Sequence, residues 1–249
     1  MKRVSLVILF TVAVAVVSHA GSIVVSNDEW MWGDGQIALG NDTQFAQNVP
    51  AFLTGGSGSI LILSNNFGLT GSGLNSELTG LGYTVTTTTT VPGSLVGYSA
   101  VYVGGYAVPD ALLTNYVNAG GNVFLEAGTG YFGGAAGEAA QWNPFLNNFG
   151  LGLAPVYNGV GCGVVGGMGG FSSELPFGPA LFNGVSSIYI CNGNDVLKIG
   201  SSPNVQVWTL GNDGLYGAYK PVVPEPSSLF LIGTGVIGLG GFLRRKINL

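Results

Sequence analysis

Away from its two ends, the chain has very little positive charge. Histidine occurs once in the 249 residues, at His19, and arginine is absent between residues 21 and 223. Only Lys198 and Lys220 stand in that range against eleven acidic residues, which gives it a formal charge of −9. Because no basic surface is available to neutralise phosphates, we expect this part of the chain not to bind nucleic acid.

The lack of histidine excludes several kinds of catalysis. Ser-His-Asp and Cys-His mechanisms need an imidazole to move a proton, and residues 21–223 contain none. Zinc sites built on histidine are excluded for the same reason, and two cysteines are too few for a four-thiolate site. We therefore expect a protein that is not an enzyme and has no catalytic residue, metal site or cofactor.

Cysteine is scarce as well, since Cys162 and Cys191 are the only two in the chain. In an oxidising compartment an isolated pair in one domain most often forms a disulfide, and we predict that bond here. The alternative is a nucleophilic or redox-active thiol. That reading lacks the basic neighbour that would lower the pKa of a thiol.

The N-terminus carries an apolar segment behind a basic start. Met1-Lys2-Arg3 precedes apolar residues 4–17, and the small-x-small triplet Ser18-His19-Ala20 comes directly before Gly21. This pattern predicts a secretory signal peptide over residues 1–20, cleaved between Ala20 and Gly21. A retained N-terminal anchor is the alternative.

The last 28 residues combine a stiff motif, an apolar run and a basic end. In Val223-Pro224-Glu225-Pro226-Ser227, each proline fixes its own φ and biases the residue before it toward extended geometry. Residues 227–243 carry no charge and, at about 17 residues, reach the lower limit for a helix that spans a bilayer. The basic residues that follow favour a cytoplasmic C-terminus; they are Arg244, Arg245 and Lys246.

This tail resembles the PEP-CTERM sorting signal of Gram-negative bacteria, over roughly a tenth of the chain. The family pattern is a Val-Pro-Glu-Pro-Ser motif, a Gly-interrupted apolar helix and a terminal Arg-rich cluster. The resemblance implies an exosortase, a membrane-embedded transpeptidase-like protease, as partner, with cutting near Pro224-Glu225-Pro226. It also implies anchoring in the inner membrane before cleavage, then release to the cell surface or the extracellular space, often in bacteria that make exopolysaccharide. An uncut C-terminal anchor is the alternative.

Between the ends, short apolar runs alternate with amphipathic segments. The pattern predicts strands at 59–64, 83–91, 100–104 and 122–127, and helices at 74–81 and 109–118. Such alternation with short loops indicates an α/β unit with a mostly parallel sheet. Further along, the sequence predicts a helix at 141–149, loops with short strands over 150–170, and strands at 187–191, 196–199, 205–210 and 215–219.

The layout of this domain resembles the flavodoxin-like, three-layer domains related to class I glutamine amidotransferases. In those families, the strand corresponding to residues 122–127 leads into an elbow with a nucleophilic cysteine. Here the elbow is Gly128-Thr129-Gly130, so the resemblance implies a catalytically silent relative. A Gly-rich β-sandwich is the alternative fold.

These features divide the chain into six parts. They are a signal peptide (1–20), an N-terminal aromatic and acidic segment (21–58), an exported α/β domain (59–219), a Pro-Glu-Pro linker (220–226), a transmembrane helix (227–243) and a basic cytoplasmic tail (244–249).

Two groups of residues qualify as candidate ligand-binding positions. The 21–58 segment has aromatic and acidic residues that suit sugar stacking or calcium ligation, although the simpler reading is that its tryptophans cover the edge of the main domain; they are Asp28, Glu29, Trp30, Trp32, Asp34 and Asp42. Glu126 and Glu138 form a conceivable glycosidase pair, and Glu126 ends a predicted parallel strand, where α/β sheets usually place ligands.

The function that these observations favour is that of an exported, non-catalytic surface or extracellular-matrix protein. It would be processed by an exosortase and associated with exopolysaccharide, because a surface rich in Asn, Ser and Thr can hydrogen-bond a hydrated polymer without strong electrostatics. A carbohydrate-active hydrolase that uses carboxylates is one alternative, and a sugar- or calcium-binding module is another.

Overall fold

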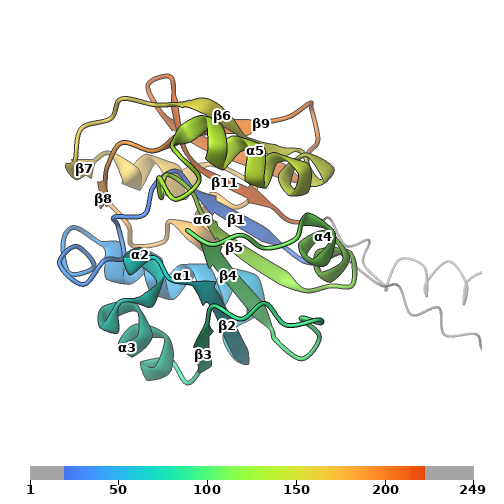
Figure 1. Ribbon diagram of the computed structural model, residues 1–249. Coiled ribbons are helices and arrows are strands. Elements are labelled where there is room, and N and C mark those ends of the chain that lie inside the picture. Colours follow the sequence, from blue (N-terminus) through green and yellow to red (C-terminus); the bar gives the residue numbers. More distant parts are fainter. Residues whose placement is uncertain (1–19, 222–249) are drawn as a thin grey trace, which may run out of the picture.

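The computed structural model describes residues 20–221 (Figure 1). The sorting motif, the predicted transmembrane helix, the basic tail and nearly all of the predicted signal peptide lie outside the described residues. Among residues 20–221, no helix combines the length and the apolar character needed to cross a membrane.

A seven-stranded sheet, in the order β10-β11-β1-β5-β4-β2-β3, forms the centre of the domain. Five neighbouring strands run parallel: β1 (Ile23–Ser26), β5 (Asn122–Glu126), β4 (Ala100–Gly104), β2 (Ser59–Ser64) and β3 (Thr84–Thr88). The remaining two are antiparallel to their neighbours: β11 (Asp213–Tyr219) and β10 (Val205–Leu210). Two small antiparallel sheets pair β6 (Leu151–Tyr157) with β9 (Asn194–Lys198), and β7 (Gly163–Gly166) with β8 (Ser187–Ile190).

Helices cover both faces of the large sheet. They are α1 (Asp42–Thr54), α2 (Phe67–Thr70), α3 (Ser72–Gly80), α4 (Asp110–Asn118), α5 (Ala135–Leu146) and α6 (Gly178–Leu181), with 3-10 turns at Asn147–Phe149 and Met168–Ser173. Side chains alternate across each strand: Val24 packs in the core that contains Phe45 of α1, whereas Ile23 and Val25 pack in the core that contains Trp142 of α5. Figure 1 shows α4 and α5 in front of the sheet and α1 behind it. The architecture is therefore three-layered.

The predicted α/β class with a mostly parallel sheet is confirmed, and the β-sandwich alternative is wrong because helices, not a second sheet, cover both faces. The predicted strands at 100–104 and 205–210 match β4 and β10. The helix predicted at 141–149 begins earlier, at Ala135, because its first turn is built from small residues that give no apolar periodicity.

The segment of residues 21–58 does not stand apart from the domain. Its first residues form β1, which lies between β5 and β11 in the interior of the sheet. Trp32 is fully buried against Phe124, with ring centroids 4.6 Å apart. The expectation that both tryptophans cover an edge of the domain is therefore wrong for Trp32, which belongs to the core.

The two ends of the described chain lie side by side. Ile23 of β1 is the cross-strand partner of Tyr219 of β11, because these strands are antiparallel. Gly21, the residue after the predicted signal cleavage, donates its N–H to the Val117 carbonyl at 2.7 Å. A Cβ at Gly21 would overlap the Gly121 carbonyl oxygen, so this close approach requires glycine. Both ends leave the domain at the amino edge of the parallel strands, on one side of Figure 1.

Cys162 and Cys191 are joined in a disulfide, as the sequence predicts. The bond links the loop before β7 to the residue directly after β8. It thereby holds the small β7-β8 sheet to the chain that continues into β9.

Replacing both Cys162 and Cys191 by Ser should lower the free energy of unfolding by about 3 to 4 kcal/mol, the chain-entropy value for a loop of roughly 30 residues. Urea unfolding of the oxidised protein and of the double variant measures the difference. A reducing agent should lower the stability of the wild type and leave that of the double variant unchanged. Equal stability of the two proteins without reductant would contradict the prediction.

Candidate functional site

The loops that follow the parallel strands meet at the carboxyl edge of the sheet. The connection after β2 runs through α2 and α3 outward to β3, and the connection after β4 runs through α4 in the opposite direction to β5. The switch point therefore lies between β2 and β4, and α/β sheets bind ligands outside the strand ends at such a point. This edge is on the opposite side of the sheet from the two chain ends.

Glu126, the last residue of β5, is fully buried at this edge. Among the described residues, neither of its carboxyl oxygens has a hydrogen-bond partner. Burial raises its pKa well above the ordinary value, and the neighbouring acids Glu29, Asp28 and Glu138 raise it further. Gly68 and Gly104 leave the space that its carboxyl group fills, since a Cβ on Gly68 would overlap Oε1.

Glu138, in the first turn of α5, is buried as well but has partners for both oxygens. Its Oε1 accepts a hydrogen bond from the Thr129 hydroxyl, and its Oε2 accepts one from the Trp142 indole N–H at 3.0 Å. Burial raises its pKa, and the two hydrogen bonds oppose that effect. Hydrogen bonds thus orient the Glu138 carboxyl group, whereas no hydrogen bond from a described residue orients that of Glu126.

Two further acids follow β1. Asp28 is buried and accepts hydrogen bonds from the backbone N–H groups of Trp30, at 2.7 Å, and Cys191, at 3.1 Å; burial still raises its pKa to about 6. Glu29 is partly exposed and accepts a hydrogen bond from the Asn66 amide. Burial, followed by the charges of Asp28 and Glu138, raises the pKa of Glu29 to about 7. Asp28, Glu29, Glu126 and Glu138 are called the carboxylate cluster below.

Aromatic side chains surround this cluster. Trp30 contacts Phe67 edge to face, with ring centroids 4.9 Å apart. The ring centroids of Tyr106 and Tyr131 lie 6.4 Å apart. Tyr157 has its hydroxyl near the loop before α5, and burial followed by the charges of Glu138 and Glu29 raises its pKa. Three of these residues come from the loops after β1, β4 and β5, one begins α2 and one ends β6. Trp30, Phe67, Tyr106, Tyr131 and Tyr157 are called the aromatic rim below.

The candidate residues from the sequence separate into two groups. Asp28, Glu29, Trp30, Glu126 and Glu138 come together at the carboxyl edge. The others have structural roles: Trp32 is in the core, Asp34 accepts the Gly73 N–H at 2.8 Å in the first turn of α3, and Asp42 accepts the Tyr189 N–H at 3.0 Å. Within residues 20–221, no group of three or more His, Cys, Asp or Glu side chains is arranged to hold a metal ion.

Sequence reasoning missed the remaining residues of the edge. Asn66, Phe67 and the tyrosines of the rim carry no motif, and Thr129 stands out only as part of the elbow Gly128-Thr129-Gly130; the roles of all these residues depend on which strands are neighbours. For all of them except Tyr157, which ends β6, the available signal was their position shortly after the predicted strands at 59–64, 100–104 and 122–127, since the carboxyl ends of parallel strands meet at one edge.

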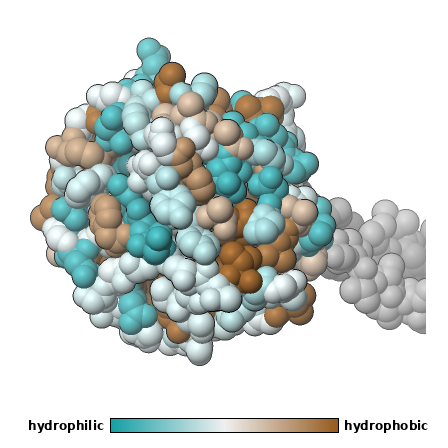
Figure 2. Space-filling model, in the orientation of Figure 1, coloured by the Kyte–Doolittle hydropathy of each residue, from teal (hydrophilic) through white to brown (hydrophobic). Residues whose placement is uncertain are grey.

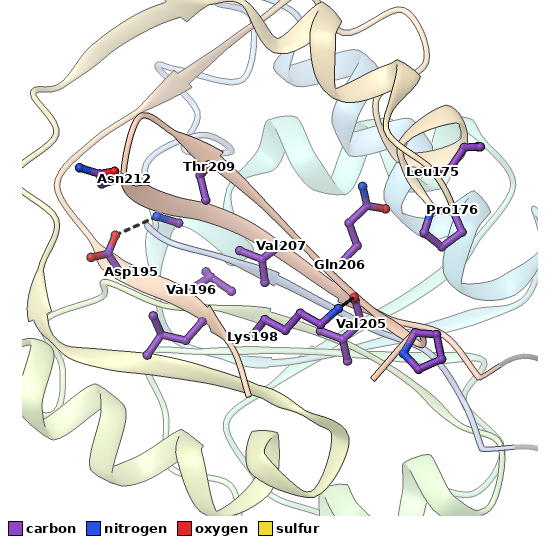
Figure 3. Close-up of a pocket in the computed structure, with 13 residues that line it drawn as sticks. Leu175, Pro176, Asp195, Val196, Lys198, Val205, Gln206, Val207, Thr209 and Asn212 are labelled. Carbon is purple, nitrogen blue, oxygen red and sulfur yellow. Dashed lines mark hydrogen bonds between the residues drawn. The ribbon is translucent and has the colours of Figure 1, made fainter. Parts of the chain in front are cut away.

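A separate groove of about 630 Å³ lies between β9 and β10 (Figure 3). Its charged side chains bond to the chain itself: Lys198 Nζ donates to the Val205 carbonyl at 2.8 Å, and Asp195 Oδ1 accepts the Gly214 N–H at 2.9 Å. The Gln206 amide oxygen accepts the Phe177 N–H at 3.0 Å. These polar groups are occupied in holding strands and loops together, which makes the groove a weaker candidate than the carboxyl edge.

Comparison with known families identifies the tail. Residues 222–246 match the PEP-CTERM protein-sorting motif, which confirms the resemblance of the segment that contains Pro224-Glu225-Pro226 and the basic Arg244-Arg245-Lys246. The motif indicates an exosortase-targeted cell-surface protein, with exosortase as its processing partner and with export and membrane anchoring before cleavage. No curated protein and no solved structure matches the chain. The flavodoxin-like resemblance therefore finds no support among known folds.

Because burial raises the pKa values of several acids, we predict that the protein becomes less stable as pH rises. The unfolded chain loses its carboxyl protons near pH 4, whereas the folded pKa is about 6 for Asp28, about 7 for Glu29 and about 8 for Asp42. Between about pH 4 and pH 8 the folded state binds more protons, so the free energy of unfolding falls as pH increases. Thermal melts across this range should show the highest melting temperature at the acid end.

The variant Glu126→Gln tests, at one residue, whether buried acids lower the stability of the protein as pH rises. An amide cannot ionise, so the variant should be more stable than the wild type at pH 8 and should show a flatter dependence of melting temperature on pH. The exposed Glu174→Gln serves as the matched control and should follow the wild type. A wild-type melting temperature that rises steadily from pH 4 to pH 8 would show that the acids are not buried as described.

Proposed function

We propose that this protein is a non-catalytic surface or matrix protein that associates with the exopolysaccharide of its host after exosortase processing. The observation that carries the proposal is the sorting motif at residues 222–246. The motif accounts for export and for transient anchoring, and the domain that it delivers has to act outside the cytoplasm.

The composition of the delivered domain supports association with a polysaccharide. Residues 21–223 contain two lysines, no arginine and no histidine, so anionic polymers and lipid surfaces are poor partners. In Figure 2 the visible face has apolar patches separated by hydrophilic ones. Such a surface can exchange hydrogen bonds with a neutral hydrated polymer.

The placement of the two ends also supports a tethered domain. The chain enters and leaves at the amino edge of the sheet, where β1 pairs with β11. The carboxylate cluster and the aromatic rim lie at the other edge. A domain held at its C-terminal end can therefore present the carboxyl edge to the surroundings.

Processing is tested by the intact mass of the native protein from membrane and extracellular fractions of the host. The extracellular species should lack residues 1–20 and everything beyond the Pro-Glu-Pro region. Glu225→Ala should keep the protein in the membrane fraction with Leu249 at its end, while the control Glu174→Ala should be released like the wild type. A wild-type protein found only in the membrane and ending at Leu249 would contradict processing. Association is tested by removing the exopolysaccharide, which should release the processed protein into the medium.

Hydrolysis is the second candidate function, because Glu126 and Glu138 lie close enough for their charges to interact. A protonated carboxyl group beside a fixed carboxylate is the arrangement that glycosidases use. Glu126, however, is fully buried, so a substrate would have to displace its neighbours to reach it.

Release of reducing ends from the host's exopolysaccharide distinguishes the two functions. We expect none from the wild type, because Glu126 is not accessible. Steady production of reducing ends that stops in Glu126→Gln, with a preserved melting transition, would establish the hydrolase and overturn the non-catalytic role.

A further inference from the structure

The chemistry of the carboxyl edge restricts what can bind there. Glu126 presents two buried acceptor atoms that no described residue fills, and buried polar groups in folded proteins normally have a partner. The charged groups that act on Glu126 are all acids, namely Glu29, Asp28 and Glu138. Because the neighbours are acids and Glu126 has no hydrogen-bond partner among the described residues, a ligand with hydroxyl groups suits this edge better than an anionic one.

The aromatic rim adds apolar surface to these acceptors. Tyr131 is 52% exposed, Phe67 41%, Tyr157 39% and Trp30 37%. Large aromatic side chains are seldom left this exposed in one place unless they meet a partner. The rim carries no positively charged side chain that would select phosphate or sulfate groups.

Residues of the aromatic rim and of the carboxylate cluster lie on loops that contact one another. Glu29 accepts its hydrogen bond from Asn66, which directly precedes Phe67. Asn66 in turn lies against Gly105, next to Tyr106, since a Cβ on Gly105 would lie 2.8 Å from the Asn66 Cβ. The Tyr157 hydroxyl lies near the loop before α5, since it would be 3.9 Å from a Cβ on Gly130 and 3.7 Å from one on Gly134. The aromatic rim and Glu29, the partly exposed acid, thus lie on neighbouring loops, and Asp28, Glu126 and Glu138 are buried beneath them.

We infer that this surface binds a neutral polysaccharide chain. The C–H faces of its sugar rings would stack on the exposed aromatic rings, and its hydroxyl groups would hydrogen-bond with Glu29, the partly exposed acid of the carboxylate cluster. This inference rests on the proposed association with exopolysaccharide and assigns that association to the carboxyl edge. A divalent cation fits less well, since the described residues offer no group of three or more ligands arranged around a metal position.

The test is affinity electrophoresis of the processed protein through gels that contain either the host's exopolysaccharide or dextran, a neutral glucan. The exopolysaccharide should retard the wild type. Trp30→Ala and Tyr131→Ala should each weaken the apparent affinity at least tenfold, and Glu29→Gln several-fold. Leu175→Ala is the matched control, because Leu175 is 78% exposed and lines the separate groove between β9 and β10. It should migrate like the wild type.

The outcomes distinguish an error in the inferred binding site from an error in the proposed association with exopolysaccharide. If the wild type is retarded and both aromatic variants are retarded equally, the inferred site is wrong and the proposed association stands. If no gel retards the wild type and removal of the exopolysaccharide does not release it from cells, the proposed association itself fails. Loss of wild-type binding in EDTA would overturn the inference, because the acids would then serve a metal ion and not sugar hydroxyls. Because Tyr131 is half exposed, Tyr131→Ala should have a melting temperature near that of the wild type. This variant therefore tests the site even if Trp30→Ala does not fold.

Discussion

The pairing of β1 on both of its edges is the constraint on which the rest of the structure depends. β1 has four residues, all buried, and it pairs parallel to β5 and antiparallel to β11. Without it, the parallel strands and the C-terminal hairpin would be two separate sheets. The antiparallel pair brings the chain ends together, and the parallel pair aligns Ser26 with Glu126. One strand therefore fixes both where the tail leaves the domain and which acids meet at the far edge.

The acids at that edge are buried or partly buried without a cationic partner among the described residues, and burial raises their pKa values. A buried carboxylate normally needs a cationic partner or several N–H donors. Residues 21–223 contain only two lysines; Lys198 Nζ bonds to the Val205 carbonyl, and Lys220 Nζ lies over the ring of Phe52. Neutralisation by a base is thus not available to the carboxylate cluster. Asp28 and Glu138 accept hydrogen bonds from N–H donors, whereas burial raises the pKa of Glu126, which has no such donor among the described residues.

Sequence reasoning succeeded where the signal was local and failed where it depended on distant pairing. The apolar runs at β4 and β10 are bounded by glycines, tyrosines and turn residues, and their limits could be read directly. β1 is a short run directly behind the predicted leader, and only its pairing with β5, about a hundred residues away, makes it a strand. α1 was missed in part because Pro50 lies inside it, and proline usually argues against a helix interior. Glu126 and Glu138 could be singled out, but the convergence of Glu29 and Tyr157 on them requires the strand order.

The separation between the two edges of the sheet bears on how such a protein can evolve and act. The sorting motif occupies residues 222–246 and follows β11, so its recognition needs no surface of the domain other than an accessible end. The carboxylate cluster and the aromatic rim are built from loops at the opposite edge, which no connection to the tail constrains. A change in the rim can therefore alter what the domain binds without affecting its export. The same tail can likewise carry an unrelated domain, because the sorting motif and the inferred binding surface share no residue.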